Sequence, residues 1–237
     1  MPILPSVTPD PPPIEITLRR SARARRFSLR VSRLDGRVTL SLPLRAREAD
    51  ALAFARAQEG WLRRALAAVP QGAELRWGAA FPLEGQLLQL APGSGRTIRA
   101  EGGALLVPGA EAQLPRRLAA FLKLRARDRL AAACDHYAAA LGRPYRSLAL
   151  RDTRSRWGSC THDGRLMFSW RLILAPPPVL DYVAAHEVAH LAQMNHSPAF
   201  WAEVARLMPD YELHRRWLKA EGQALHAWRF APPETDG

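Results

Sequence analysis

Two histidines four residues apart, with a glutamate directly after the first, have the types and spacing to build a metal-dependent catalytic site. They lie in the segment His186-Glu187-Val188-Ala189-His190. On a helix, residues i and i+4 share one face about 6 Å apart, so both imidazoles can bind one Zn²⁺ at about 2.0–2.1 Å. The glutamate then lies beside the metal, where it can take a proton from metal-bound water and pass it to a leaving group. The spacing therefore predicts a zinc site with Glu187 as its general base.

A third zinc ligand is expected, because a catalytic zinc usually has three protein ligands and keeps one position for water. His196, six residues after His190, is the residue we expect to fill this place. A later carboxylate, Glu203 or Glu212, is the alternative. An amphipathic helix whose two histidines bind no metal is the competing interpretation of the motif.

The chain has to turn between the second and third histidines, because six residues of continuous helix would place them on different faces. Met194-Asn195 is the expected turn, since Asn tolerates the left-handed conformation that ends helices. Ser197-Pro198 then fits the N-cap and first residue of a new helix.

Residues around the motif extend the pattern over a longer part of the chain. They are Arg156-Trp157-Gly158-Ser159-Cys160, Trp170-Arg171-Leu172-Ile173, Ala175-Pro176, Asp181-Tyr182-Val183, Asn195-His196-Ser197, Phe200-Trp201 and Pro209-Asp210-Tyr211. In this order they resemble the YgjP-like metallopeptidase-domain family of bacteria, which belongs with the SprT-like and WLM-type zinc proteases in the zincin group. The resemblance is dense over about residues 145–220 and looser over 14–110. The metzincins share the histidine spacing, but their glycine position is Gln193 here.

The resemblance implies a zinc metallopeptidase acting on a protein or peptide, with a small sheet over the active-site helix and a cleft between them. We expect the segment Arg154–Cys160 to line this cleft, where Arg154 or Arg156 would bind a substrate carboxylate or an oxyanion. Tyr211 and His214 follow the last ligand and are further candidate donors to the transition state.

Two residues near the motif have less specific interpretations. Asp181 either orients a ligand histidine from behind or is a first-turn acid that favours the helix dipole. Cys160 is expected to pack behind the site. We expect both Cys160 and Cys134 to be free thiols, because they share no C-x-x-C spacing.

The net charge of +12 suggests a nucleic-acid partner, but the composition weakens that hypothesis. Only Lys123 and Lys219 among the 34 basic residues are lysines, in a chain rich in alanine, leucine and proline. Arginines gather within 19–30 and again within 116–129, with few aromatic residues between them for stacking on bases. A solvated basic face is therefore the favoured interpretation, and nucleic acid is a less favoured partner.

Location follows from two absences in the sequence. No run of eighteen apolar residues exists, so no membrane span is expected. The proline-rich segment 1–13 has no apolar core or cleavage pattern of a signal peptide, and we expect a disordered lead-in to a cytoplasmic protein.

Periodicity predicts an α+β protein: a β-rich N-terminal unit with one helix over 14–110, then a zincin-like catalytic domain over 111–237. The first unit alternates like strands over 14–43 and 73–108, with helical spacing over 45–69 and a hairpin signal at Asp35-Gly36. In the second, helices are expected over 112–141, 178–194, 198–207 and 211–224, and strands over 145–150 and 166–172.

Three other functions stay open on the sequence alone. The same zinc site would suit phosphoanhydride hydrolysis of a nucleotide, since the nearby arginines fit phosphates. A DNA-associated protease would use the basic N-terminal unit as its DNA-binding module. A purely structural zinc site is the third, but such a site has no need of Glu187.

Overall fold

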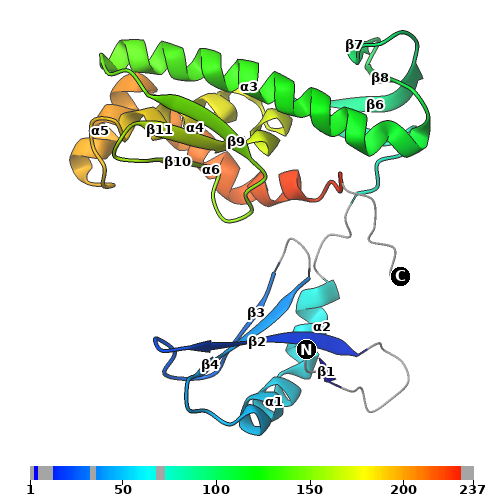
Figure 1. The fold of residues 1–237 in the computed structure, drawn as a ribbon, viewed down its shortest axis with the longest axis vertical. Helices are drawn as coiled ribbons and strands as arrows, with labels where there is room; N and C mark the ends of the chain where they lie inside the picture. Colours follow the sequence, from blue (N-terminus) through cyan, green and yellow to red (C-terminus); the bar gives the residue numbers. More distant parts are fainter. Residues whose placement is uncertain (1–2, 5–12, 33–35, 68–72, 231–237) are drawn as a thin grey trace. The chain divides into compact units, whose positions relative to one another are not determined.

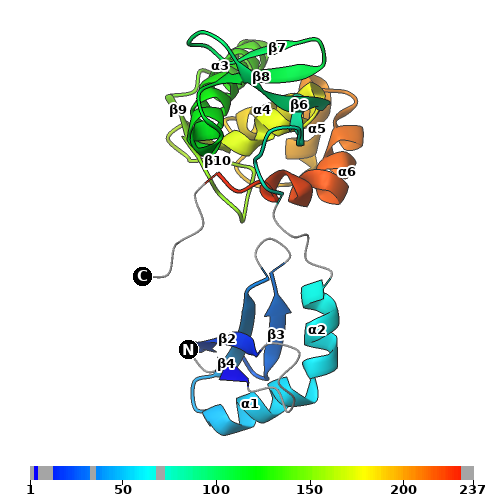
Figure 2. The same cartoon turned by 90° about the vertical axis from the view of Figure 1, so that its right-hand side faces the viewer.

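The computed structural model describes residues 3–4, 13–32, 36–67 and 73–230, and its contacts divide the chain into two units, Met1–Gly72 and Ala73–Gly237. Each unit combines sheet and helix (Figures 1 and 2), which confirms the predicted α+β class. The expected lead-in over 1–13 lies largely outside the described residues. Within it, Ile3–Leu4 forms the short strand β1.

The first unit is a four-stranded sheet with two helices. The strands run in the order β1-β2-β4-β3, with β2 and β4 parallel and β3 and β4 antiparallel. The elements are β2 (Ile14–Ser21), β3 (Ser28–Val31), β4 (Val38–Pro43), α1 (Glu48–Ala57) and α2 (Glu59–Ala67). Ile16, Leu40 and Leu42 alternate along their strands and are fully buried, as the period of two predicts.

Two details of this unit bear on the predictions. β3 and β4 form the expected antiparallel pair, although Asp35 in the hairpin signal lies outside the described residues. The single helix predicted over 45–69 is two helices instead, because the backbone at Gln58 leaves the helical region (φ −103°, ψ 11°). The second helix can then turn Leu62 into the core, where it is fully buried.

The second unit begins with a four-stranded sheet in the order β5-β6-β8-β7. Its strands are β5 (Ala80–Leu83), β6 (Gln86–Gly93), β7 (Arg99–Glu101) and β8 (Ala104–Pro108). The predicted boundary at 110 is wrong, because these strands pack into the same core as the C-terminal helices. The backbone N–H of Glu84, for example, donates to the carbonyl of Ile173 (2.8 Å).

Helix α3 (Leu114–Leu141) follows a 3-10 turn, η1 (Glu111–Gln113), and runs along the whole second unit (Figure 1). It buries one residue per turn at Leu114, Leu118 and Leu122. It packs against β8, the 3-10 helix η2 (Trp170–Leu174) and helix α4 (Pro177–Ala189). The helix ends where predicted, since Gly142 adopts the left-handed conformation (φ 72°) that closes helices.

A three-stranded sheet contacts α3 through β9 and α4 through β10. Its order is β10-β11-β9, so the short strand β10 is at one edge, antiparallel to β11. The strands are β9 (Ser147–Arg151), β10 (Gly158–Cys160) and β11 (Arg165–Ser169). β11 ends earlier than predicted, because Trp170–Leu174 forms a buried 3-10 helix, η2.

Four helical segments complete the second unit, namely α4 (Pro177–Ala189), α5 (Pro198–Leu207), α6 (Tyr211–Glu221) and the 3-10 helix η3 (Gly222–His226). α4 is buried on almost all sides and contacts α3, α5, α6 and β10. It is therefore the central element of this unit, as an all-round apolar helix has to be. None of the described helices has the length and apolar character needed to cross a membrane.

Candidate metal centre

The chain leaves α4 in a different way from the predicted turn. The helix ends at Ala189, five residues before the expected end, and His190 is its C-cap with near-helical angles (φ −63°, ψ −21°). No left-handed residue is used at Asn195, since Glu84 is the only described non-glycine residue with a positive φ. The Asn195 side chain instead accepts a hydrogen bond from the N–H of Ser197 (3.3 Å). The prediction of a left-handed asparagine is therefore wrong, because its side chain makes the turn.

The start of α5 agrees with the sequence. Ser197 is the N-cap and its hydroxyl accepts a hydrogen bond from the N–H of Phe200 (3.4 Å), with a proline in the first turn. This cap fixes the direction of the new helix and places Phe200, fully buried, under the histidines. The ring centre of Phe200 lies 4.9 Å from that of His186, 4.4 Å from His190 and 4.8 Å from His196.

The three histidines converge on one place. One ring nitrogen from each of His186, His190 and His196 lies within 4.8 Å of the others. The Nε2 atoms of His186 and His196 approach to 3.1 Å. Three imidazole nitrogens at this separation fit a transition metal such as Zn²⁺, which leaves a fourth tetrahedral position open.

The lowered pKa values of His186 and His190 favour metal binding, because a metal needs neutral imidazole. Burial, with the nearby His190 and His196, lowers the pKa of His186 to about 3. Burial also lowers the pKa of His190, whose Nδ1 donates to the carbonyl of Gln193 (3.0 Å). That bond fixes the tautomer and leaves the lone pair of Nε2 for a ligand.

The alternative carboxylate ligands lie elsewhere. Glu203 pairs with Arg206 (2.9 Å), and Glu212 accepts a hydrogen bond from the hydroxyl of Tyr211 (3.4 Å). Within the described residues, neither belongs to the group of converging ligand atoms.

Glu187 is buried against strand β10, with 5% of its surface exposed. A Cβ atom placed on Gly158 would lie 2.5 Å from Oε1 of Glu187, so only a glycine leaves room for this carboxylate. Burial raises the pKa of Glu187 to about 8, against the opposing effect of Arg156. A raised proton affinity suits a group that has to accept a proton from water.

A cleft of about 450 Å³ separates β10 from the histidines. It is lined by Ser155, Arg156, Gly158, Ser159 and Cys160 on one side and by His186, Glu187, His190, Met194 and His196 on the other. A second cavity of about 190 Å³ shares Gly158, His186 and Glu187 with it and is closed by Trp157, Tyr182, Val183 and Leu218. His186 and Glu187 therefore line both the cleft and the smaller cavity.

The other predicted contact residues are divided between the cleft and its surroundings. Arg156 lines the cleft, whereas Arg154 is exposed outside its lining. The ring of Tyr211 stacks on Trp201 (5.5 Å between centres) and also lies outside the lining. His214 is buried and donates to Asp210 (3.1 Å), away from the cleft.

Asp181 and Cys160 are also placed by the structure. Asp181 makes no hydrogen bond to a histidine of the centre among the described residues; burial raises its pKa, and Arg129 and His136 oppose this shift. Cys160 lines the cleft, but burial and the nearby Glu187 raise the pKa of its thiol to about 11. Both cysteines are free, as predicted.

Gly158 and Phe200 have roles that sequence reasoning did not assign. Gly158 lies inside the segment predicted to line the cleft, which is the one signal that pointed to it. Phe200 is among the residues that carry the family resemblance, but no role follows from that, because an apolar residue on an amphipathic helix is typical of ordinary core.

Comparison with known proteins identifies a family for this chain and a solved structure that is similar to part of it. No curated protein matches this chain. The crystal structure of the metallopeptidase zymogen of Pyrococcus abyssi abylysin is similar to part of it, with a TM-score of 0.35 and 19% sequence identity. That similarity covers 38% of this chain and 93% of the other. The family model for the YgjP-like metallopeptidase domain matches residues 25–221, which include the whole cleft and all three histidines. The chain therefore belongs to the YgjP-like metallopeptidase-domain family.

Proposed function

We propose that this protein is a zinc-dependent peptidase of the zincin type, in which His186, His190 and His196 hold the metal and Glu187 is the general base. The observation that carries the proposal is the convergence of three imidazole nitrogens within 4.8 Å. The carboxylate of Glu187 lies beside them, in space left by the missing side chain of Gly158. The family supports a metal-dependent peptidase independently of this geometry.

Zinc is the metal that best suits this donor set, because it accepts three nitrogen ligands and keeps a fourth position open. When bound, it supplies Lewis acidity to water and to a substrate carbonyl. The protein contributes fixed orientation: the carbonyl of Gln193 holds the His190 ring, and Phe200 packs under all three rings.

Glu187 is the residue we propose to move the proton. Its carboxylate accepts the proton of the attacking water and then delivers it to the amine that leaves from the cleaved peptide bond. Burial favours the protonated form, so the proton is held until the leaving nitrogen can take it.

Substrate binding is proposed at the free edge of β10. Within the described residues this strand pairs only with β11, so its other edge can pair with an extended peptide in the cleft. Arg156 lines the same cleft and is the residue we propose to bind a substrate carboxylate or an oxyanion. Arg154, Tyr211 and His214 lie outside the lining and are not given this role.

The test is cleavage of unfolded, fluorescein-labelled casein by the zinc-loaded full chain. We expect Glu187→Gln to lower the rate by about 100-fold or more while zinc is retained, since general-base catalysis contributes on that scale. Glu203→Gln is the matched control and is expected to keep both activity and zinc, because Glu203 pairs with Arg206 outside the centre. Release of phosphate or pyrophosphate from nucleoside triphosphates, with no cleavage of casein, would contradict a peptidase.

A further inference from the structure

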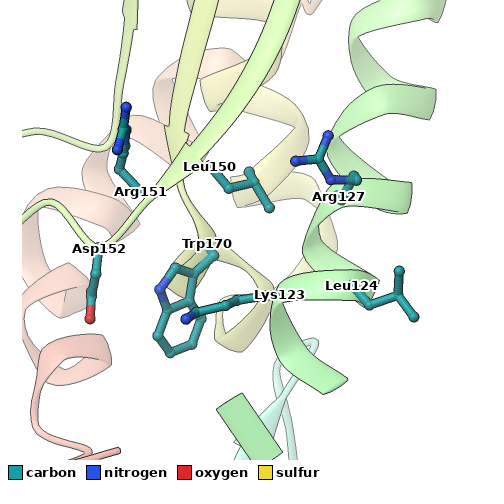
Figure 3. Close-up of a pocket in the computed structure, with 7 residues that line it drawn as sticks. All are labelled: Lys123, Leu124, Arg127, Leu150, Arg151, Asp152 and Trp170. Atoms are coloured by element: carbon teal, nitrogen blue, oxygen red, sulfur yellow. The ribbon is translucent and has the colours of Figure 1, made fainter. Parts of the chain in front are cut away.

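A third cavity, of about 520 Å³, lies between α3 and β9 (Figure 3), and none of the three histidines lines it. Its lining includes Lys123, Leu124 and Arg127 from α3, Leu150 and Arg151 from β9, and Trp170. We call it the α3–β9 pocket. Its volume is within the range of ordinary ligand sites.

The α3–β9 pocket carries uncompensated positive charge. Within the described part of the chain, no carboxylate forms an ion pair with Lys123, Arg127 or Arg151. Asp152 also lines the pocket, but both of its oxygens accept hydrogen bonds from the buried Arg171 (2.6 and 3.1 Å). The charge of Asp152 is therefore already balanced, and the pocket favours an anionic ligand.

The cations do not surround a single point. The ammonium group of Lys123 lies over the Trp170 ring, 5.9 Å from its centre, while the guanidinium of Arg127 lies beside Leu150 (Figure 3). Arg151 projects on the other side of Leu150 in the same view. One compact anion cannot contact all three groups, so the arrangement fits a ligand whose negative charges are spaced apart.

Apolar surface separates these charges. Leu150 lies between Arg127 and Arg151 in Figure 3, whereas Leu124, a residue 62% exposed, projects from α3 on the side away from Leu150. A ligand that alternates acidic and apolar groups would satisfy both features. A polypeptide segment with spaced carboxylates has this chemistry.

The α3–β9 pocket is close to the metal cleft along the chain. Asp152 lines the pocket and Ser155 lines the cleft. Three residues span at most about 11 Å when extended, so one polypeptide of modest length can reach both places. We propose that the α3–β9 pocket binds an acidic, partly apolar segment of the protein substrate, outside the segment that is cleaved.

This inference rests on the proposed peptidase function, but its test does not depend on catalysis. The full chain carrying Glu187→Gln is titrated against a fluorescein-labelled octapeptide of alternating glutamate and alanine, and binding is followed by fluorescence anisotropy. Adding Lys123→Gln with Arg127→Gln is expected to weaken binding about tenfold or more, because two charge-assisted contacts are lost. A matched octapeptide with glutamine in place of glutamate is expected not to bind.

The control removes the same charge from the same helix, outside the pocket. Arg116→Gln with Arg117→Gln is expected to change the affinity less than about twofold. These substitutions remove only a long-range attraction to the peptide, which salt screens. Equal weakening by both pairs of substitutions, or no binding of the acidic peptide, overturns the proposal. Binding of tripolyphosphate or of a DNA oligonucleotide through Lys123 and Arg127, without binding of the peptide, also overturns it. Absence of casein cleavage would overturn the peptidase function and leave this binding result intact.

Discussion

Gly158 and Glu187 are in such close contact that a methyl group on the glycine would lie 2.5 Å from Oε1 of the glutamate. The contact joins the edge strand β10 to the central helix α4. It ties the strand proposed to bind substrate to the proposed general base, so the position of one limits the position of the other.

Gly158→Ala is predicted to displace the carboxylate of Glu187 and to lower the rate of casein cleavage by about 100-fold. Zinc content should not change, because the three atoms nearest to a Cβ on Gly158 all belong to Glu187 and none to a histidine. Gly60→Ala is the control, since a Cβ atom there meets only the end of the Arg64 side chain, at 3.7 Å. Normal turnover by Gly158→Ala would show that the contact does not position the base.

Phe200 is predicted to support metal affinity without touching the metal. Phe200→Leu removes part of the ring surface under His186, His190 and His196 and should weaken zinc binding about tenfold, as loss of supporting contacts does. The measurement is competition with a chromogenic chelator. Val204→Ala, also fully buried on α5, is the control for loss of packing alone. Equal zinc affinities for wild type and both variants would contradict this role.

His226 makes the stability of the protein depend on pH. Its ring stacks on Trp157 (4.7 Å), and burial, with smaller help from Arg171, lowers its pKa to about 4. An unfolded chain with a histidine pKa of about 6.5 binds the proton more readily, so stability is lost as pH falls from about 6.5 towards 4.

The measurement is the thermal midpoint at several pH values. His226→Phe keeps an aromatic ring beside Trp157 and removes the titration, so its midpoint should fall less between pH 7 and pH 5 than that of wild type. Parallel curves for the two proteins would contradict the contribution of His226.

Arg171 is predicted to hold the loop after β9 to the C-terminal segment. It is 6% exposed, binds both oxygens of Asp152 and donates to the carbonyls of Leu225 (3.2 Å) and Trp228 (3.0 Å). Arg171→Lys keeps the charge, but a lysine cannot make all four of these hydrogen bonds at once. We expect the substitution to lower the free energy of unfolding by about 2 kcal/mol.

Arg206→Lys is the control for Arg171, because the bonds of Arg206 to Glu203 and to the carbonyl of Ala140 (3.2 Å) are exposed and should contribute less than about 1 kcal/mol. Denaturant unfolding measures both variants. Equal stabilities would show that the Arg171 bonds add nothing beyond a surface pair.

Local signals in the sequence predicted much of the fold. Gly142 ends α3 where expected, and Ser197 caps α5 as expected. Both predictions succeed because a cap depends on a few neighbouring residues and their backbone angles. The pairing of β3 with β4 was predictable for the same reason.

Long-range packing explains the failures. The strands over 80–108 were predicted, but not that they share a core with the C-terminal helices. Alternation along a strand shows which face is apolar, but not which element packs on that face. Strand β10 has only three residues, too few for alternation to appear. Gly158 and Glu187 are in contact although they are 29 residues apart in the sequence. Helix and strand periodicity relate only residues a few positions apart, so they could not predict this contact.

The central claim is that three histidines hold one metal ion, and elemental analysis of the purified full chain tests it most directly. About one zinc per chain is expected in wild type, in Glu187→Gln and in the exposed control His162→Ala. His190→Ala and His196→Ala should lose most of it while circular dichroism shows them folded. Zinc retained by His196→Ala, or absent from wild type after incubation with the metal, would contradict the three-histidine site.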